Sequence, residues 1–231
     1  MIFAGFQKLT LLDDPTHVSC TLFTQGCTFK CPFCHNSELI DINAAPFEHI
    51  EEDEVLSFLK KRQGILDSVS ITGGEPLMQT ELPAFLRKVK DLGFDIKLDT
   101  NGHFPERLRE TAEAGLIDRV AMDIKNCPGK YAETIGLENF DLEPIKQSIA
   151  FLKGGSLPFE FRTTVVREFH TAEDMKEIAQ WLEGTENYFL QGFVDSGNVL
   201  KSGLHAVSKE GMDRFAEIMR PYIPKVALRG V

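Results

Sequence analysis

The feature that most constrains the fold is a regular alternation of short, β-branched apolar runs with amphipathic helical stretches. This alternation is typical of a mostly parallel sheet covered by helices, either open or curled into a barrel. Residues 81–92 and 172–183 show helical spacing, with apolar side chains at i, i+3, i+4 and i+7. The runs that predict strands are VSCTLFT (18–24), SVSIT (68–72), FDIKLD (94–99), DRVAMDIK (118–125), PFEFRTTVV (158–166), NYFLQGF (187–193) and KVAL (225–228).

Local signals mark where the predicted helices begin and end. Thr171 and Asp174 have the spacing of a capping box. Glycine follows a helical pattern, where a left-handed residue is favoured, at Gly64, Gly93, Gly115 and Gly184. No linker, charge block or low-complexity segment divides the chain, so we predict an α/β fold in a single domain over residues 1–231.

Composition excludes several function classes. The formal net charge is −10, and broad nucleic-acid or anionic-membrane binding needs a basic surface. The N-terminal stretch has no basic leader or cleavage site, and no segment approaches the ~20 apolar residues of a membrane span. We therefore predict a cytoplasmic protein that binds neither nucleic acid nor membrane. Thiols stay reduced in the cytoplasm, so clustered cysteines there are metal ligands or catalysts rather than disulfides.

Three of the five cysteines form the pattern C-x3-C-x2-C at Cys27, Cys31 and Cys34. Their thiolates are close enough along the chain to hold one inorganic centre. A four-iron cluster usually takes four cysteines, and with three of them one iron keeps an open position for a substrate. A zinc site needs a fourth ligand, and His35 is poorly spaced to close a tetrahedron with Cys34. The residues that could in principle complete a zinc site are His103, Cys20 and Cys127. The spacing favours a cluster over zinc.

Polar or glycine-rich residues follow four of the predicted strands. Active sites in parallel α/β folds form at the C-terminal ends of the strands, so these residues are expected to converge on one rim. They are the cysteine loop, GGEP (73–76), DTNG (99–102) and the pair Asp123 and Lys125. Taken singly, each has a simpler explanation: a turn for GGEP and for DTNG, a cap for a strand-end aspartate, and a snorkelling side chain for Lys125.

The cysteine pattern is the signature of the radical S-adenosylmethionine (SAM) superfamily, and FTQGCTFKCPFCHN (23–36) closely resembles its glycyl-radical-enzyme activating branch. GFQKLTLLDDPTHVSCTLFTQGC, ITGGEP, LDTNG and VAMDIK extend the resemblance over essentially the whole chain. The compact chain most resembles activating proteins of anaerobic ribonucleoside-triphosphate reductase, and pyruvate formate-lyase activating enzymes are close relatives. The resemblance implies a partial (β/α)6 TIM-like barrel of the radical SAM type.

The resemblance also implies a reaction. Cys27, Cys31 and Cys34 would ligate a [4Fe–4S] cluster whose fourth iron is chelated by the amino and carboxylate groups of SAM. One electron would then break the sulfur–C5′ bond of SAM, giving methionine and a 5′-deoxyadenosyl radical. That radical would abstract hydrogen from a backbone glycine of a partner enzyme, anaerobic ribonucleotide reductase. The implied electron donor is a flavodoxin or a ferredoxin.

Several residues acquire expected roles by the same resemblance. The loop containing Gly73, Gly74 and Glu75 is expected to contact the amino group of SAM. Lys125 is expected to meet the SAM carboxylate. Arg162 matches another residue of the site, and its guanidinium suits a carboxylate or the partner's backbone.

The remaining assignments concern the adenosyl group and the surroundings of the cluster. Gln191 stands near the place where formate-lyase activators have a histidine, so it is expected to contact SAM or its ribose. Phe33 would cover the adenine or shield the cluster, although packing is the simpler role for a phenylalanine. His35 is expected to donate a hydrogen bond near the cluster, while Cys20 and Cys127 are expected to be structural.

A monovalent cation is implied beside SAM. In pyruvate formate-lyase activating enzymes, the matching Asp-Thr pair and a second aspartate bind such an ion. The matching candidates here are Asp99, Thr100, Asp123 and the carbonyl of Ala121. Hard oxygen ligands suit such an ion.

Alternative functions remain open from the sequence. The chain is also compatible with an activator of another glycyl-radical enzyme of the pyruvate formate-lyase type. A small-molecule radical SAM enzyme such as a deazaguanine synthase has a similar GGEP and a similar short length. A third class is a zinc- or cluster-binding module without catalysis.

Overall fold

The structure is a computed structural model that describes residues 1–11, 14, 17–44, 49–195 and 197–231. The described chain divides into two compact units. Unit 1 comprises Met1–Thr28, Glu38–Ala121 and Pro144–Pro158, and unit 2 comprises Phe29–Ser37, Met122–Glu143 and Phe159–Val231. Four residues of the motif quoted above lie outside the described residues: Leu12, Asp13, Pro15 and Thr16. The single domain over residues 1–231 remains a prediction.

Unit 1 contains a sheet with the strand order β6-β5-β3-β2. β3 pairs in parallel with β5, and β5 pairs in parallel with β6, while β2 is antiparallel to β3. A separate antiparallel pair joins β1 to β4. The strands are β1 (Ile2–Phe3), β2 (Gly5–Thr10), β3 (Ser19–Thr24), β4 (Ile50–Glu51), β5 (Ser68–Gly73) and β6 (Asp95–Thr100). The helices are α1 (Glu52–Lys60), α2 (Leu82–Asp91), α3 (Pro105–Glu113) and, apart from its first residue, α5 (Glu143–Gly154).

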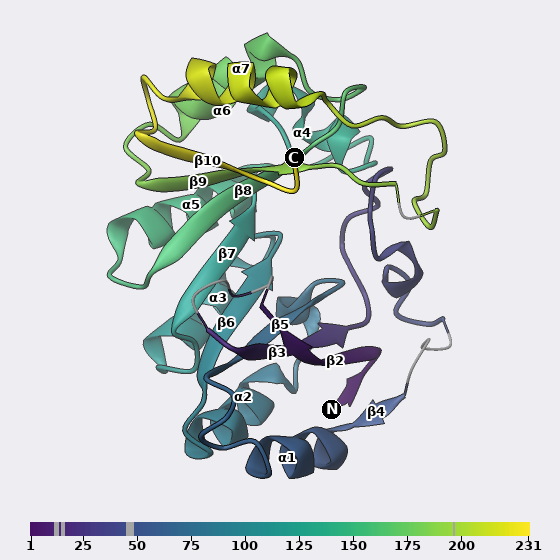
Figure 1. The fold of residues 1–231 in the computed structure, drawn as a ribbon, viewed down its shortest axis with the longest axis vertical. Coiled ribbons are helices and arrows are strands. Elements are labelled where there is room, and N and C mark those ends of the chain that lie inside the picture. The colour runs from purple at the N-terminus through teal and green to yellow at the C-terminus, as the bar shows by residue number, and fades with distance from the viewer. Residues whose placement is uncertain (12–13, 15–16, 45–48, 196) are drawn as a thin grey trace. The chain divides into compact units, whose positions relative to one another are not determined.

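Unit 2 contains three strands in the order β10-β9-β8, and both pairings are parallel. Figure 1 shows α6 and α7 lying side by side, with α7 over β9 and β10. The elements are β8 (Phe159–Val165), β9 (Asn187–Gly192), β10 (Lys225–Arg229), α4 (Tyr131–Thr134), α6 (Ala172–Trp181) and α7 (Lys209–Met219). β7 (Arg119–Asp123) begins in unit 1 and ends in unit 2. The short 3-10 helices are η1 (Ser37–Leu39), η2 (Pro76–Met78) and η3 (Pro128–Lys130).

The predicted α/β class with a mostly parallel sheet is confirmed. Each of the seven predicted strands is present, with ends within two residues of the predicted ones. The capping box of Thr171 and Asp174 is present at the start of α6. The glycines predicted to follow helices have positive φ angles, and they are Gly64, Gly93, Gly115 and Gly184. β2 was not predicted, because most of its side chains are exposed or half-buried and the strand carries little apolar signal.

The alternation of side chains along β5 and β6 separates two kinds of surface in unit 1. In the parallel register, Val69 lies beside Ile96 and Ile71 beside Leu98, and all four are fully buried. The opposite face of the same pair carries polar side chains, because successive residues of a strand point to opposite sides. This polar face includes Ser68, Ser70, Asp95, Lys97 and Asp99.

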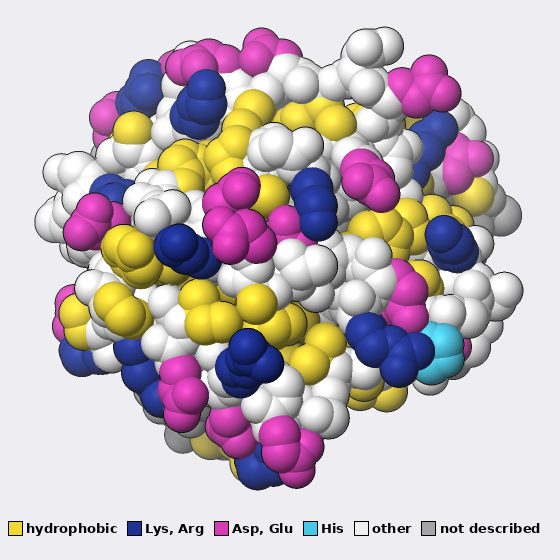
Figure 2. Space-filling view, turned by 90° about the horizontal axis from the view of Figure 1, so that it is seen from above, with side chains coloured by type: hydrophobic (Ala, Val, Ile, Leu, Met, Phe, Trp, Pro, Cys, Tyr) yellow, Lys and Arg dark blue, Asp and Glu magenta, His cyan; other side chains and the backbone are white. Residues whose placement is uncertain are grey.

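The face of the molecule shown in Figure 2 carries both charged and apolar side chains. On that face, acidic and basic side chains are interspersed with apolar ones, and neither sign of charge forms a large patch (Figure 2). Within the described residues, no helix is both long enough and apolar enough to cross a membrane.

Candidate functional site

The base of the cysteine loop is closed by backbone hydrogen bonds in unit 1. Gly26, with φ +94°, donates its N–H to the carbonyl of Leu39 over 2.7 Å, and the N–H of Cys27 donates to Ile40 over 3.0 Å. The chain therefore leaves β3 and returns at Leu39 beside its own starting point. This closure holds the backbone of Cys27 at the C-terminal end of a buried strand, where the sequence predicted it.

The other two cysteines lie in unit 2 and share a tight turn. The N–H of Cys34 donates to the carbonyl of Cys31 over 3.0 Å, which brings the two residues together. Lys30 is anchored through its N–H to the carbonyl of Ile135. The Cys31 side chain is buried, and that of Cys34 is half-buried.

Phe33 lies between these two cysteines and is buried. Its ring packs against Phe169, with 5.6 Å between the ring centroids, and its ring also contacts His170. The structure therefore gives Phe33 a packing role in unit 2. Its contact with an adenine stays a prediction.

The described residues contain no group of three His, Cys, Asp or Glu side chains placed to hold a single metal ion. A four-iron cluster has a different requirement, because each thiolate binds a separate iron. Two features around the thiols suit such an anionic cluster. The Asn101 Nδ2 lies 3.7 Å from the Sγ of Cys27, and the Lys125 ammonium interacts electrostatically with Cys31. Hydrogen bonds and cations near the sulfurs stabilise the cluster's negative charge, so these residues fit the implied group.

Asn101 was missed as a functional residue because the sequence DTNG has a sufficient explanation as a turn. The side-chain carbonyl of Asn101 does serve that turn, accepting a hydrogen bond from the N–H of His103 over 2.9 Å. Its amide nitrogen contacts the hydroxyl of Thr28 at 3.4 Å as well as the Cys27 sulfur. Asn101 therefore links the turn after β6 to the start of the cysteine loop.

The glycines of GGEP allow two loops to meet backbone to backbone. The N–H of Gly74 donates to Thr24 over 2.8 Å, and the N–H of Glu75 donates to the carbonyl of Gly26 over 2.7 Å. A Cβ on Gly74 would lie 2.2 Å from the Gly26 carbonyl oxygen, and one on Gly73 would lie 2.3 Å from the Thr24 nitrogen. Only glycine fits at either position without moving backbone. Contact between Gly73, Gly74 and SAM stays a prediction.

Glu75 connects the GGEP loop to the turn after β6. Its carboxylate is fully buried and accepts hydrogen bonds from the Thr100 hydroxyl at 2.8 Å and from the Asn101 N–H at 2.7 Å. It also accepts from the N–H of Leu77 at 3.1 Å, which begins η2. Glu75 is thus a positioning residue in the structure, and its predicted contact with the amino group of SAM is untested.

The predicted cation site draws on residues of both units. In unit 1, Asp99 accepts a hydrogen bond from the ammonium of Lys97 at 2.6 Å. The Thr100 hydroxyl donates to Glu75 and accepts from the N–H of Gly102 at 3.1 Å. Ala121 is a fully buried residue of β7. These contacts leave the cation site a prediction.

In unit 2, Asp123 is flanked by two cations. The Lys125 ammonium lies 2.7 Å from one of its oxygens, and the Arg162 Nε lies 2.5 Å from the other. Burial disfavours the charged carboxylate, but the charges of Arg162 and Lys125 outweigh it and hold the pKa of Asp123 well below its usual range. Burial disfavours the ammonium of Lys125 as well, but Asp123 outweighs that effect and raises the pKa of Lys125.

Asp123, Lys125 and Arg162 together carry a net charge of +1, since all three are ionised at neutral pH. Such a group suits an anion that arrives from solution, such as the carboxylate of an amino acid. The SAM-binding roles of Lys125 and Arg162 stay predictions.

The remaining predicted residues have well-defined surroundings. Gln191 is a half-buried residue of β9, paired with Thr164 of β8, and its contact with SAM stays a prediction. His35 is exposed, and its Nε2 lies 2.8 Å from the carbonyl of Val194 while its ring stacks on Phe193.

The two remaining cysteines behave as structural residues. Burial raises the pKa of the Cys20 thiol to about 12 and that of the Cys127 thiol to about 11. Both are therefore protonated at neutral pH, as expected of cysteines that serve packing.

His170 is a buried residue that the sequence gave no reason to select. Its Nδ1 lies 3.0 Å from the N–H of Val166, and its Nε2 lies 2.9 Å from the carbonyl of Lys125. A neutral ring satisfies both contacts, with Nδ1 accepting and Nε2–H donating. Burial lowers the pKa of His170, which agrees with this assignment. His170 thereby holds the backbone of Lys125.

We expect His170 to make stability fall below about pH 6.5, the ordinary pKa of an unfolded histidine. A lowered pKa in the folded state means that the unfolded state binds the proton more readily, so acid favours unfolding. Urea unfolding at pH 7.5 and 5.5 should show a loss from this residue of at most about 1.4 kcal/mol per pH unit.

The His170→Gln variant should lose that part of the pH dependence. His49→Gln is the matched control, because His49 is exposed and contacts Glu51 at the surface. An unchanged slope in His170→Gln would show that this ring is not kept neutral by its surroundings.

Comparison with known proteins agrees with this geometry. The model of the Radical SAM superfamily matches residues 21–182. A provisionally named glycyl-radical enzyme activating enzyme of Methanocaldococcus jannaschii is 30% identical over 239 residues, which cover 100% of this chain and 96% of that protein. A 7-carboxy-7-deazaguanine synthase of Thermococcus kodakarensis is 32% identical over 126 residues, covering 47% of this chain and 49% of that protein.

Among solved structures, Streptococcus suis SuiB bound to S-adenosylmethionine is similar, with a TM-score of 0.71 and 16% identity. The match covers 90% of this chain and 49% of the SuiB chain, so this chain spans about half the length of SuiB. A likeness at this level of identity concerns the fold alone.

Proposed function

This chain belongs to the radical SAM superfamily, and on that premise we propose that it is an activase for a glycyl-radical enzyme. It would cleave SAM reductively at a [4Fe–4S] cluster and use the 5′-deoxyadenosyl radical to generate a glycyl radical on its partner. We propose anaerobic ribonucleoside-triphosphate reductase as that partner. The observation that carries the proposal is the 30% identity, over the whole chain, to a relative named as an activating enzyme of this kind.

Cys27, Cys31 and Cys34 would hold the cluster, which when bound supplies the electron that cleaves SAM. The amide of Asn101 would donate to the Cys27 sulfur, as it does in the structure. A flavodoxin or a ferredoxin would provide the electron. None of the five cysteines, all within the described part of the chain, forms a disulfide, which suits the cytoplasmic location that we propose.

The residues around Asp123 would receive the carboxylate of SAM. Lys125 and Arg162 supply one positive charge in excess of Asp123, and a carboxylate would neutralise it. The backbone of GGEP, held against Gly26 by its glycines, would face the amino group of SAM. Gln191 would contact the adenosyl group.

In the proposed reaction, one electron and one SAM would give methionine and a 5′-deoxyadenosyl radical. That radical takes one hydrogen atom from a glycine Cα of the partner, leaving 5′-deoxyadenosine and the glycyl radical. No oxidant is needed.

The test is an anaerobic incubation of the reconstituted protein with SAM, a reductant and the reductase, followed by electron paramagnetic resonance. We expect the doublet of a glycyl radical, together with stoichiometric 5′-deoxyadenosine. SAM cleavage without the doublet would move the proposal to another partner. Zinc in place of iron, with no 5′-deoxyadenosine formed, would contradict radical chemistry and favour a metal-binding module.

A second candidate is a radical SAM enzyme that acts on a small molecule. The 32% identity to a 7-carboxy-7-deazaguanine synthase favours it, although that match covers less than half of this chain. A pyruvate formate-lyase type of partner is the other alternative. Trials of several glycyl-radical enzymes distinguish these possibilities, because only a protein substrate gives the doublet.

A further inference from the structure

Lys97 and Asp99 form a buried ion pair at the C-terminal half of β6. The two side chains are two residues apart on one strand and therefore point to the same side of the sheet. Their ammonium and carboxylate are 2.6 Å apart, and only 6% and 8% of the two side chains are exposed. Lysine is almost never buried this deeply unless it is paired, because burying an ammonium is costly.

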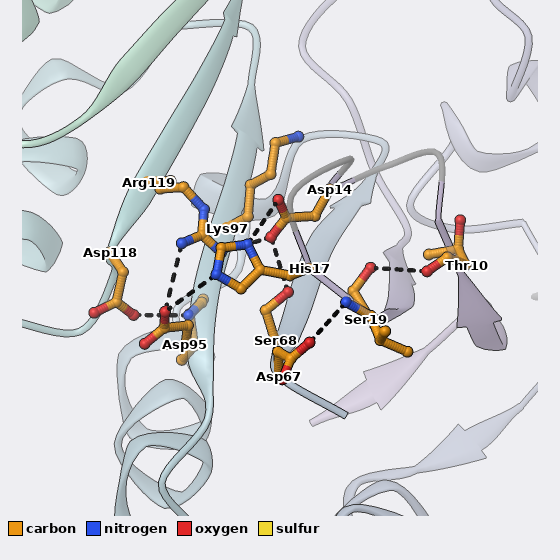
Figure 3. Close-up of polar contacts among 12 residues, drawn as sticks. Thr10, Asp14, His17, Ser19, Asp67, Ser68, Asp95, Lys97, Asp118 and Arg119 are labelled. Carbon is orange, nitrogen blue, oxygen red and sulfur yellow. Dashed lines mark hydrogen bonds and ion pairs between the residues drawn. The ribbon is translucent and has the colours of Figure 1, made fainter. Parts of the chain in front are cut away.

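A separate cluster of charged side chains lies at the other end of β6. Arg119 pairs with Asp14 at 2.5 Å and with Asp95 at 3.4 Å, and His17 lies beside Asp14 (Figure 3). Figure 3 shows the Lys97 side chain extending away from this cluster. Its ammonium meets Asp99 instead. Lys97 therefore serves the end of the strand where the predicted SAM site lies.

Asp99 is also the first ligand of the monovalent cation expected from the sequence. An ammonium and a monovalent metal ion carry the same charge, and both are bound by oxygen atoms. The second predicted carboxylate, Asp123, has Lys125 and Arg162 as its own cations. Each carboxylate of the predicted cation site is thus already matched by a basic side chain.

We infer that the ammonium of Lys97 is a built-in cation that takes the place of an exogenous monovalent ion at Asp99. SAM binding is then independent of potassium and sodium. The inference rests on the proposed function in one respect, namely that SAM binds at this end of β6. It makes Lys97 a positioning residue, since Lys97 acts through Asp99.

The first test compares the affinity of wild-type protein for SAM in potassium chloride and in tetramethylammonium chloride at equal ionic strength. Tetramethylammonium is too large and too poor a hydrogen-bonding partner to replace a metal ion. Equilibrium dialysis with labelled SAM on the anaerobically reconstituted protein gives the dissociation constant. We expect a change of less than about twofold, and a loss of about tenfold or more in tetramethylammonium would overturn the inference.

The second test removes the ammonium in Lys97→Met, which keeps an unbranched apolar stem and lacks the terminal nitrogen. The vacated position should then take a metal ion, so SAM should bind at least about tenfold more weakly in tetramethylammonium and recover in potassium. Lys90→Met is the matched control. Lys90 also pairs with an aspartate of unit 1, Asp118, but on a partly exposed helix, so its loss should create no selectivity for potassium. Lys97→Met without such selectivity would refute the inference.

A third measurement does not depend on SAM. Potassium that binds the folded state should make the melting temperature of Lys97→Met higher in potassium chloride than in tetramethylammonium chloride. The wild type should have the same melting temperature in both salts. The double variant Lys97→Met/Asp99→Asn removes both charges and should show no potassium response. If Lys97→Met does not fold in either salt, the wild-type dialysis decides the matter.

The two proposals fail in different ways. A potassium response confined to Lys97→Met, together with no glycyl radical on any glycyl-radical enzyme tried, leaves this inference standing and removes the proposed function. If wild-type protein needs potassium to bind SAM and a glycyl radical forms, the proposed function stands and this inference fails.

Discussion

Replacing Cys27, Cys31 or Cys34 with alanine, one at a time, is expected to abolish SAM cleavage while the chain remains folded. Each thiolate would bind a separate iron, so the loss of one leaves the cluster without its full set of protein ligands. Stability changes little by comparison, since Cys27 and Cys34 are half-buried and a cysteine is a small side chain. The measurements are iron content, 5′-deoxyadenosine formed and the circular dichroism spectrum of each variant.

Cys20→Ala and Cys127→Ala are the matched controls, one in each unit. Both thiols are buried and protonated, so these variants should keep their iron and their activity. Wild-type turnover in any one of the three loop variants would contradict ligation by three cysteines.

Gly74→Ala is expected to destabilise the protein strongly by adding one methyl group near the site. The new Cβ would lie 2.2 Å from the carbonyl oxygen of Gly26, and that atom belongs to backbone held by Leu39. The loops must then separate, and the hydrogen bond from the N–H of Glu75 to Gly26 is lost. We expect a loss of about 2–4 kcal/mol in the free energy of unfolding, from overpacking and from the broken bond.

Gly154→Ala is the matched control, because nothing lies within 4 Å of the Cβ that it would add. Its free energy of unfolding should stay within about 0.5 kcal/mol of wild type. Urea unfolding and SAM dialysis should be measured on both variants. A Gly74→Ala protein with normal stability and normal SAM affinity would show that the close contact of the two loops is unnecessary.

The parallel strands were predictable because they are buried on both faces. Such strands are short runs rich in β-branched residues, as SVSIT of β5 is, where the buried Val69 and Ile71 alternate with the buried Ser68 and Ser70. That period of two stands out from the helical spacing. β2 was missed for the opposite reason, since an edge strand with exposed side chains loses that signal. Local chemistry made the start of α6 predictable, because a capping box is complete within four residues.

Some contacts of the site can be predicted from the sequence, and others cannot. Lys97 and Asp99 are two residues apart on one predicted strand, so their side chains point to the same side and their pairing can be read from the sequence. His170 carried no such signal, because its partners are backbone groups brought close only by folding. Arg162 was selected by resemblance, but its ion pair with Asp123 joins residues 39 positions apart.

The amino-acid sequence by itself determined where three thiols lie along the chain, since their spacing is covalent, and which loops end the buried strands. Only the tertiary structure decided what those residues contact. It brought the Glu75 carboxylate into hydrogen bonds with the turn after β6 and packed Gly74 against Gly26. It also placed the cations of Lys125 and Arg162 beside Asp123. The physical reason is that burial makes the energy of a polar group depend on its neighbours in space, and these come from distant parts of the chain.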